Sequence, residues 1–448
     1  MEAMRRTQGE KTGWDFGFPS HHERDMSQTI KNLPGFRDFY PEQCALRNYI
    51  FERWRGLTRR YGYAEYEGPV LEPTELFTRK SGEEIVKQLF HFKDGGERAV
   101  ALRPEVTPSL ARMAAARQRD YKKPLKWFQI GPCFRYETPQ LGRGREFYQL
   151  NCDILGEAGP GADADLVALA IDLMLDFGFV EGDFVVRLSD RRLWDAFVSG
   201  AGLNEEQLPL FLQIIDKMER EKPEVTEQKL ATLGTSLAAV REFMADPSHG
   251  QTGALGELLA NLAARNLAQY VKIDLGIVRG LAYYTGVVFE IFDSGGEFRA
   301  VAGGGRYDHL CKLIGGVEMP AVGFAMGDMV MGAFLNSRSG PQAQWQAWQA
   351  RAQALQAYIV VADETQRSQA LQLLQSLRGV NLRVDAPLAA LKVGAQFQAA
   401  EYHGARFAIV VGAEYPMVKL KDMQSREERE LPAGEVIGEL IQRLTEAA

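Results

Sequence analysis

The sequence predicts an α+β fold followed by a smaller α/β domain, and three patterns indicate this arrangement. Residues 89–105, "LFHFKDGGERAVALRPE", place two strand-like runs around a Gly-Gly turn, which is typical of an antiparallel hairpin. Residues 146–155, "EFYQLNCDIL", alternate with a period of two and predict a strand of a second hairpin. From about residue 352 onward, strand-like and helix-like segments alternate, which predicts an α/β unit.

Length and composition indicate a soluble protein with more than one domain. The 448 residues exceed what one compact core accommodates, so we expect two or three domains. Hydrophobic residues make up 46% of the chain and charged residues 25%, and no apolar run is long enough to cross a bilayer. The formal net charge of -7 argues against indiscriminate binding of nucleic acid, but it allows a local basic surface.

Cysteine and histidine usage favours a cytoplasmic protein without a zinc site. The six histidines show no ligand spacing, and the four cysteines include no C-x-x-C pair, so we expect reduced thiols. Residues 1–28 contain an arginine pair with no hydrophobic segment behind it, which argues against a secretory signal. We interpret them as a disordered tail, or as sequence upstream of a start near Met26. The cysteines are Cys44, Cys133, Cys152 and Cys311.

The first large unit is expected over residues 29–336. It opens with a helix whose apolar residues recur at helical intervals and which ends at Gly62. After the two hairpins, residues from about 161 to 270 have a mostly helical pattern, which we interpret as a helical insertion. Strand signals return in "YYTGVVFEIF" and "FRAVAGGGRYDHL", and a helix-like apolar segment at 321–335 closes the unit.

A linker is predicted at residues 337–351, which are rich in Gln, Ala and Ser and contain Gly340-Pro341. The predicted α/β domain then occupies residues 352–448. The order of its segments is strand, helix, strand, helix, strand and a last helix, "GEVIGELIQRL".

Three arginines surround a glycine-bearing loop in "FRYETPQLGRGREFYQ" (134–149), although the chain is acidic. Guanidinium groups suit a polyphosphate, because they stay charged and bind phosphate oxygens through a planar fork. The alternative is that these arginines only pair with Glu137 and Glu146, and the loop alone leaves both interpretations open. No Walker loop is present. The arginines are Arg135, Arg143 and Arg145.

The period of two assigns the polar residues of this hairpin to one face of the sheet. Arg135 and Glu137 share a face of the first strand. On the second strand, one face carries Phe147, Gln149, Asn151 and Asp153, and the other carries Tyr148, Leu150, Cys152 and Ile154.

Several segments together resemble the class II aminoacyl-tRNA synthetases of the histidyl type. "FRYETPQLGRGREFYQLNCDILG" (134–156) resembles their motif 2, and "GYAEYEGPVLEP" (62–73) resembles their motif 1. "LRPEVTPSLAR" (102–112) is similar to another segment of the family. "GIVRGLAYYTGVVFE" (276–290) and "AGGGRYDHL" (302–310) resemble its two histidine signatures. The resemblance runs from about Leu33 to Leu444.

This resemblance implies a fold and an activity. The fold would be an antiparallel sheet flanked by helices, with a C-terminal anticodon-binding α/β domain. The activity would be that of a cytoplasmic, homodimeric histidine–tRNA ligase, which uses ATP and Mg²⁺ to join histidine to tRNA(His).

The resemblance also assigns roles to residues around histidine. Glu105, Thr107 and Gln149 would hold the amino group, and Asp153 would face the imidazole. The aromatic residues that would line the histidine site are Tyr283, Tyr284 and Tyr307.

Four residues are implied around ATP. Arg135 would bind the α-phosphate, and Arg143 would meet the outer phosphates, with Arg145 and Glu137 beside them. A further arginine, Arg279, would contact both the α-phosphate and the attacking carboxylate from the opposite side.

Two departures from the family pattern leave an alternative open. Motif 3 usually ends in G-x-E-R-[LIV] with an ATP-binding arginine, whereas "GFAMGDMVMGAF" has Asp328, Met329 and Val330 there. ATP binding would then depend more on Arg143 or Arg145, or the site would be impaired. Ala282 also stands where the family more often has Asp.

The alternative is a non-catalytic, histidine-binding paralogue such as the regulatory subunit of ATP phosphoribosyltransferase. The altered motif 3 favours it. Arg279, the intact motif 2 and the complete C-terminal domain favour the ligase more strongly.

Overall fold

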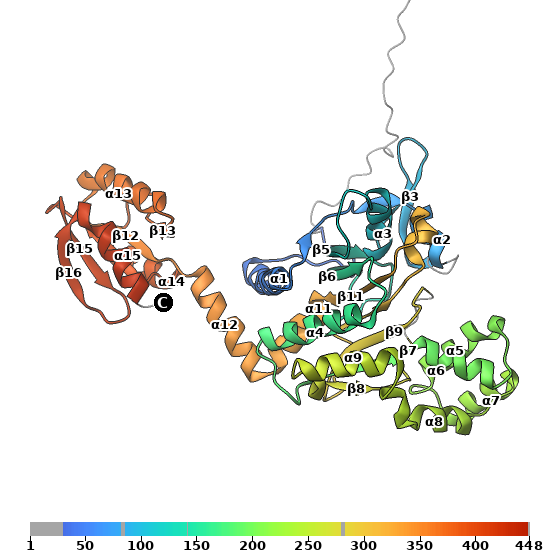
Figure 1. Cartoon of the computed structure of the whole chain (residues 1–448). Coiled ribbons are helices and arrows are strands. Elements are labelled where there is room, and N and C mark those ends of the chain that lie inside the picture. The colour runs from blue at the N-terminus through green and yellow to red at the C-terminus, as the bar shows by residue number, and fades with distance from the viewer. Residues whose placement is uncertain (1–29, 82–85, 141, 279–282, 447–448) are drawn as a thin grey trace, which may run out of the picture.

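The computed structural model describes residues 30–81, 86–140, 142–278 and 283–446. Figure 1 shows a large first domain and a smaller C-terminal domain, with helix α12 (Ser339–Gln353) running between them. Within these described ranges, no helix is both long enough and apolar enough to cross a membrane.

The first domain is built on an eight-stranded sheet in which most neighbouring strands run antiparallel. Only the two edge pairs, β1 with β5 and β7 with β8, are parallel. The predicted antiparallel sheet is therefore confirmed. The strand order is β1-β5-β6-β11-β10-β9-β7-β8. In that order, the bounds are Ala64–Glu65, Leu125–Phe134, Glu146–Leu155, Ala321–Gly327, Ala302–Arg306, Val287–Asp293, Phe184–Asp190 and Val271–Ile273.

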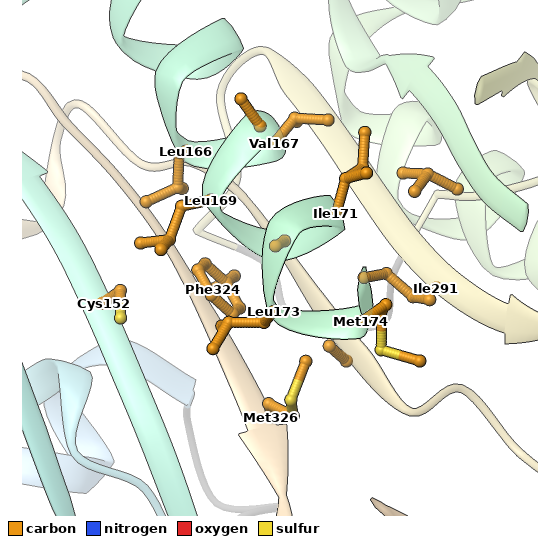
Figure 2. Close-up of a cluster of buried hydrophobic side chains, with 14 of the residues drawn as sticks. Cys152, Leu166, Val167, Leu169, Ile171, Leu173, Met174, Ile291, Phe324 and Met326 are labelled. Atoms are coloured by element: carbon orange, nitrogen blue, oxygen red, sulfur yellow. The ribbon is translucent and has the colours of Figure 1, made fainter. Parts of the chain in front are cut away.

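Helices cover one face of this sheet and form the main core with it. Helix α4 is apolar around most of its circumference, so it is buried rather than laid on the surface. Figure 2 shows its side chains packed over Cys152, Phe324 and Met326 of the strands beneath. The covering helices are α1 (Pro41–Arg60), α4 (Pro160–Asp176), α9 (Gly253–Ala264) and α11 (Asp328–Ser337).

The second hairpin forms as its alternation predicts. Strands β5 and β6 pair antiparallel along their whole length. Leu150, Cys152 and Ile154 of β6 point into the core under α4. The side chains between them therefore face away from the helices. The two faces of this strand are thus set by the apolar row.

The opposite face of the sheet is covered only in part. Helices α3 (Thr107–Ala116) and α10 (Leu310–Gly315) pack on it and on each other. The first predicted hairpin is also confirmed, because β3 (Phe90–Lys93) and β4 (Ala99–Leu102) pair antiparallel. They form a small sheet with β2 (Leu71–Pro73), next to helix α2 (Glu75–Ser81).

The separate helical insertion is shorter than the predicted range of about 161–270. Helices α4 and α9 belong to the main core, and β7 is a strand of the large sheet. Helical periodicity identifies a helix but does not show which core it packs on, which explains the difference. The remaining cluster has its own buried core around Trp194 and Phe211. It consists of α5 (Arg191–Gly200), α6 (Leu208–Lys217), α7 (Pro223–Leu233) and α8 (Leu237–Ala245).

The apolar segment at 321–335 is a strand followed by a helix, not one helix. Its first half is β11, which pairs with both β6 and β10 in the middle of the sheet. A continuous apolar run fits a buried strand and a buried helix equally well, so the sequence alone did not separate them.

The C-terminal domain has a five-stranded sheet in the order β13-β12-β14-β15-β16, with helices packed against it. Its alternating first part follows the prediction, but the final hairpin of β15 and β16 was not predicted. The strands are β12 (Ala357–Val361), β13 (Val384–Asp385), β14 (Phe407–Val411), β15 (Met417–Asp422) and β16 (Glu428–Pro432), and the helices are α13 (Arg367–Gly379), α14 (Val393–Tyr402) and α15 (Val436–Glu446).

The stretch predicted as a linker forms helix α12, and this helix is fixed to the first domain. The rings of Trp345 and Trp348 lie 6.4 and 5.4 Å from the ring of Tyr49 in α1. Trp348 also donates a hydrogen bond to Glu52, at 3.2 Å. The connection is thus a packed helix, and the first domain extends into it.

Removing this packing should destabilise the first domain. The double variant Trp345→Ala/Trp348→Ala loses apolar area and the aromatic contacts to Tyr49, so we expect a loss of about 2–4 kcal/mol. Thermal unfolding of the first domain measures it. Gln346→Ala, on the exposed side of the same helix, is the control. Equal melting temperatures for the two variants would contradict this account of α12.

Candidate active site

A cavity of about 780 Å³ opens on the face of the large sheet that α4 leaves uncovered. This volume is in the range of sites that enclose small molecules. Strands β6, β9, β10 and β11 supply its floor, and the loop between β5 and β6 and the start of α3 supply its walls.

Small residues make the floor of this cavity. Gly303 on β10 and Gly323, Ala325 and Gly327 on β11 line it. A Cβ atom on Gly323 would lie 1.8 Å from Oδ1 of Asp153 on the neighbouring strand. The absence of a side chain there is therefore required for that carboxylate to occupy its place.

A buried carboxylate lies behind one end of the cavity. Asp153 is only 2% exposed, and its Oδ1 accepts a hydrogen bond of 2.5 Å from the hydroxyl of Tyr307, which lines the cavity. Its Oδ2 has no partner among the described residues. Burial raises the pKa of Asp153 to about 7, although the hydrogen bond from Tyr307 opposes this shift. An unpaired buried acceptor of this kind suits a ligand with an N–H donor.

Two other residues predicted around histidine, Glu105 and Tyr283, are linked to Tyr307 at this end. Glu105 is 9% exposed and accepts a hydrogen bond of 3.3 Å from the hydroxyl of Tyr283. The ring of Tyr283 meets that of Tyr307 edge-on at 5.8 Å. The residues predicted around histidine that line the cavity are Glu105, Thr107, Gln149, Tyr283, Tyr284 and Tyr307.

Two of the predicted arginines line the cavity beside the loop between β5 and β6. Arg135 donates to the carbonyl oxygen of Pro104 at 3.0 Å, and its guanidinium lies 5.2 Å from the ring centre of Phe147. Arg143 forms an ion pair of 2.7 Å with Glu137, which also lines the cavity. Both arginines are thus held by groups of the same hairpin and of the segment before α3.

Arg143 lies in a crowded cationic environment. Burial lowers its pKa, and repulsion from Arg299 and Arg135 acts in the same direction, while Glu137 opposes the shift. This end of the cavity therefore favours an anion.

The other two predicted arginines, Arg145 and Arg279, add no observed contact to this end of the cavity. Arg145 is not among the described residues that line the cavity. Its guanidinium lies 4.3 Å from the ring centre of Tyr136 and donates to the carbonyl oxygen of Glu137 at 3.1 Å. Arg279 and Ala282 lie outside the described residues, so their assignments stay predictions.

The motif 3 segment presents apolar side chains to the cavity. Met329 and Val330 line it, at the start of α11. Asp328 instead is buried and accepts hydrogen bonds from Arg37, at 2.8 Å, and from the backbone N–H of Tyr148, at 2.9 Å. This substitution thus ties the N-terminal segment and β6 to α11.

Sequence reasoning missed three charged residues that line the cavity, Arg220, Glu290 and Arg299, and it placed Asn151 on the polar face without giving it a role. Glu290 interrupts the apolar run "VVFEIF", which was a usable signal. Arg299 and Arg220 follow turn-like or polar segments without periodicity, so only the fold places them here.

Metal sites built from protein side chains alone are not evident in the part of the chain that the structure describes. No group of three or more His, Cys, Asp or Glu side chains there is placed to hold an ion. The four cysteines are free thiols, three of them buried.

Comparison with known proteins gives a consistent result. A family model described as histidyl-tRNA synthetase matches residues 35–329, and one described as an anticodon-binding domain matches residues 356–443. The chain is 41% identical to a histidine–tRNA ligase of Opitutus terrae over 432 residues, 91% of this chain and 97% of that one. It is 36% identical to one of Haloarcula marismortui, over 90% of this chain and 95% of that one.

Solved structures agree with these relatives. The crystal structure of a histidyl-tRNA synthetase from a Nostoc species superposes with a TM-score of 0.74 at 26% identity. The match covers 93% of this chain and all of the other.

The ionisation of Asp153 should make stability depend on pH. Its pKa is about 7 in the folded protein and near 3.9 in an unfolded chain, so between these values the folded state binds more protons and stability falls as pH rises. The Asp153→Asn variant has no carboxylate to ionise at this position, so it does not lose stability in this way as the pH rises. The melting temperature of Asp153→Asn relative to that of the wild type should therefore be about 5 °C higher at pH 8 than at pH 5.

Asp165→Asn controls for the loss of a charge, because it removes a carboxylate that is ion-paired with Lys126 near the surface. Parallel pH profiles for wild type and Asp153→Asn would show that burial does not perturb Asp153.

Proposed function

The chain belongs to the histidyl-tRNA synthetase family, whose members are ATP-dependent histidine–tRNA ligases, and we propose that its cavity activates histidine with ATP before transfer to tRNA(His). The observation that carries the proposal is the polarity of the cavity. A buried carboxylate, one oxygen of which has no partner among the described residues, lies behind one end, and arginines line the wall formed by the loop between β5 and β6.

The proposed reaction needs no nucleophile from the protein. The carboxylate oxygen of histidine attacks the α-phosphorus of ATP, the bond to the bridging oxygen of the β-phosphate breaks, and pyrophosphate leaves. The protein has to align the reactants and to stabilise the charge on the phosphate oxygens. A cavity that holds both reactants between fixed charges supplies these two requirements.

We assign recognition of the imidazole to Asp153. Its Oδ2, which has no partner in the described part of the chain, would accept the hydrogen bond of an imidazole N–H, while Tyr307 holds Oδ1 in place. A site that pairs a substrate donor rejects an analogue without that donor, because the buried acceptor would then stay unpaired. Glu105, Thr107 and Gln149 would bind the amino group, since all three line the cavity.

We assign the α-phosphate to Arg135 and the outer phosphates to Arg143, which would exchange part of its contact with Glu137 for phosphate oxygens. Arg279 is proposed to contact the α-phosphate from the opposite side. Mg²⁺ that arrives on ATP needs only one or two protein carboxylates. Glu137 and Glu290 line the cavity and would be its ligands. The ion would neutralise charge on the outer phosphates.

The C-terminal domain is proposed to bind the anticodon of tRNA(His), in accord with the domain model that it matches. A homodimer is also proposed. The small sheet of β2, β3 and β4 exposes Leu71 and Phe92, and such apolar side chains suit a protein contact. Free thiols support a location in the cytoplasm.

The second candidate is a histidine-binding paralogue without ligase activity, like the regulatory subunit of ATP phosphoribosyltransferase. The apolar side chains of Met329 and Val330 favour it, because they replace a phosphate contact. Arg135 and Arg143 on the cavity wall and the presence of the C-terminal domain favour the ligase.

Histidine-dependent exchange of labelled pyrophosphate into ATP tests the activity. We expect exchange by the wild type, and a KM for histidine at least tenfold higher in Asp153→Asn with the KM for ATP within about twofold, because only the imidazole contact changes. Equal increases in both KM values would contradict the assignment of Asp153. The paralogue instead predicts no exchange, together with activation of an added phosphoribosyltransferase.

Truncation tests the role of the C-terminal domain. The cut belongs after Gln353, because α12 packs on the first domain and a cut at Gly340 would remove Trp345 and Trp348. Residues 1–353 should retain pyrophosphate exchange within about threefold. Their charging of tRNA(His) should fall at least a hundredfold, since a second docking surface is lost.

Anticodon substitutions provide the matched comparison for this truncation. They should weaken charging by the full chain and leave that by residues 1–353 unchanged. Equal sensitivity of the two proteins would refute anticodon binding by the C-terminal domain, without affecting the catalytic assignment.

A further inference from the structure

We propose that Arg299 binds the outer phosphates of ATP and supplies the cation that motif 3 lacks in this chain. The inference rests on the proposed function and adds a residue to the ATP end of its site. Arg299 lies in the connection between β9 and β10, and it lines the cavity together with Arg135 and Arg143.

Contacts place Arg299 next to the loop between β5 and β6. Its Nη2 donates a hydrogen bond of 2.8 Å to the side-chain oxygen of Gln140. Gln140 in turn pairs with Arg143 through two backbone hydrogen bonds, of 2.9 and 3.0 Å. Gln140 thus links Arg299 to Arg143, the arginine assigned to the outer phosphates.

The charge balance at this end of the cavity calls for an anion. Arg143 has Glu137 as its ion-pair partner, whereas Arg299 has no ion pair in the described part of the chain and is held by a neutral amide. Repulsion from Arg299 also reaches Arg143, since it helps to lower the pKa of that side chain. A cluster of guanidinium groups that outnumbers its neighbouring carboxylates favours the binding of an anion.

The motif 3 segment meets the same region of the loop from another side. A Cβ atom on Gly142 would lie 3.1 Å from Cγ2 of Val330, so Val330 contacts the loop that carries Arg143. An arginine at Val330 would therefore approach the phosphates that Arg143 meets. Because the side chain there is apolar, a cation for this position has to come from a neighbouring element, and Arg299 is next to it.

The other arginines near the cavity fit this role less well. Arg145 lies against Tyr136 and does not line the cavity. Arg220 lines it, but it comes from the helical cluster between α6 and α7, and no contact links it to the loop that carries Arg143 among the described residues.

Pyrophosphate exchange by the full-length protein measures the contribution of Arg299. In Arg299→Ala we expect the KM values for ATP and for pyrophosphate each to rise about tenfold or more, with the KM for histidine within about twofold. The variant should bind 5′-O-(N-histidyl)sulfamoyl adenosine as tightly as the wild type, because this analogue of the adenylate has no outer phosphates. Equal binding of the analogue also shows that the variant folds.

Two further variants separate contact with phosphate from an effect on the loop. Gln140→Ala removes the tether but keeps Arg299, so its KM for ATP should stay within about twofold of wild type. The double variant Arg299→Ala/Val330→Arg restores a cation from the motif 3 side. Its logarithm of the KM for ATP should return at least halfway from the value of Arg299→Ala to that of the wild type.

The inference is overturned if Arg299→Ala leaves the KM values for ATP and pyrophosphate unchanged in an enzyme whose wild type is active. It is also overturned if Gln140→Ala reproduces the loss, because Arg299 would then only position the loop. A wild type without histidine-dependent exchange is a different result, since it refutes the proposed function itself and this inference with it.

Discussion

The register of β6 between β5 and β11 is the constraint on which the rest of the site depends. Leu150, Cys152 and Ile154 must face α4, because the side of that helix that packs on the sheet is apolar. A shift of one residue would turn this apolar row toward the cavity and bury the polar row under the helix. The hydrophobic core therefore fixes where Gln149 and Asp153 lie.

Glycine and a buried arginine extend the same constraint to neighbouring strands. Asp153 fits only because β11 has Gly323 opposite it. Arg103, fully buried, donates hydrogen bonds of 2.8 Å to the carbonyl oxygens of Gly68 and Pro132, and so joins the segment before β2 to β5. Contacts between neighbouring strands and segments thus hold Asp153 and the strands around the cavity in place.

The periodic parts of the fold were predictable from the sequence, and the parts fixed by long-range contacts were not. Alternation in β6 and the turn between β3 and β4 identified two hairpins, because a strand with one buried face carries its own signal. The strand β11 and the helix α12 were not identified. A continuous apolar run and a Gln-rich stretch have no such signal until a partner covers them.

The residues of the site also divide into those that the sequence predicted and those that only the fold reveals. The loop arginines were candidates from their own pattern, and Arg135 and Arg143 among them line the cavity, whereas the tyrosines were assigned through resemblance to a family, which concerns segments of sequence. Arg299 was missed, because a single arginine after a turn is ordinary until β9 and β10 bring it beside Gln140. Arg37 and Asp328 lie near opposite ends of the first domain's sequence, so no local sequence pattern predicts that they pair.

One cavity is proposed to hold the imidazole at Asp153 and the phosphates among the arginines. A crystal structure of the full chain with histidine and ATP tests it most directly. We expect an imidazole nitrogen within about 3.2 Å of Oδ2 of Asp153, and phosphate oxygens within hydrogen-bonding distance of Arg135, Arg143 and Arg299. An imidazole bound away from Asp153, or phosphates bound outside these arginines, would contradict it.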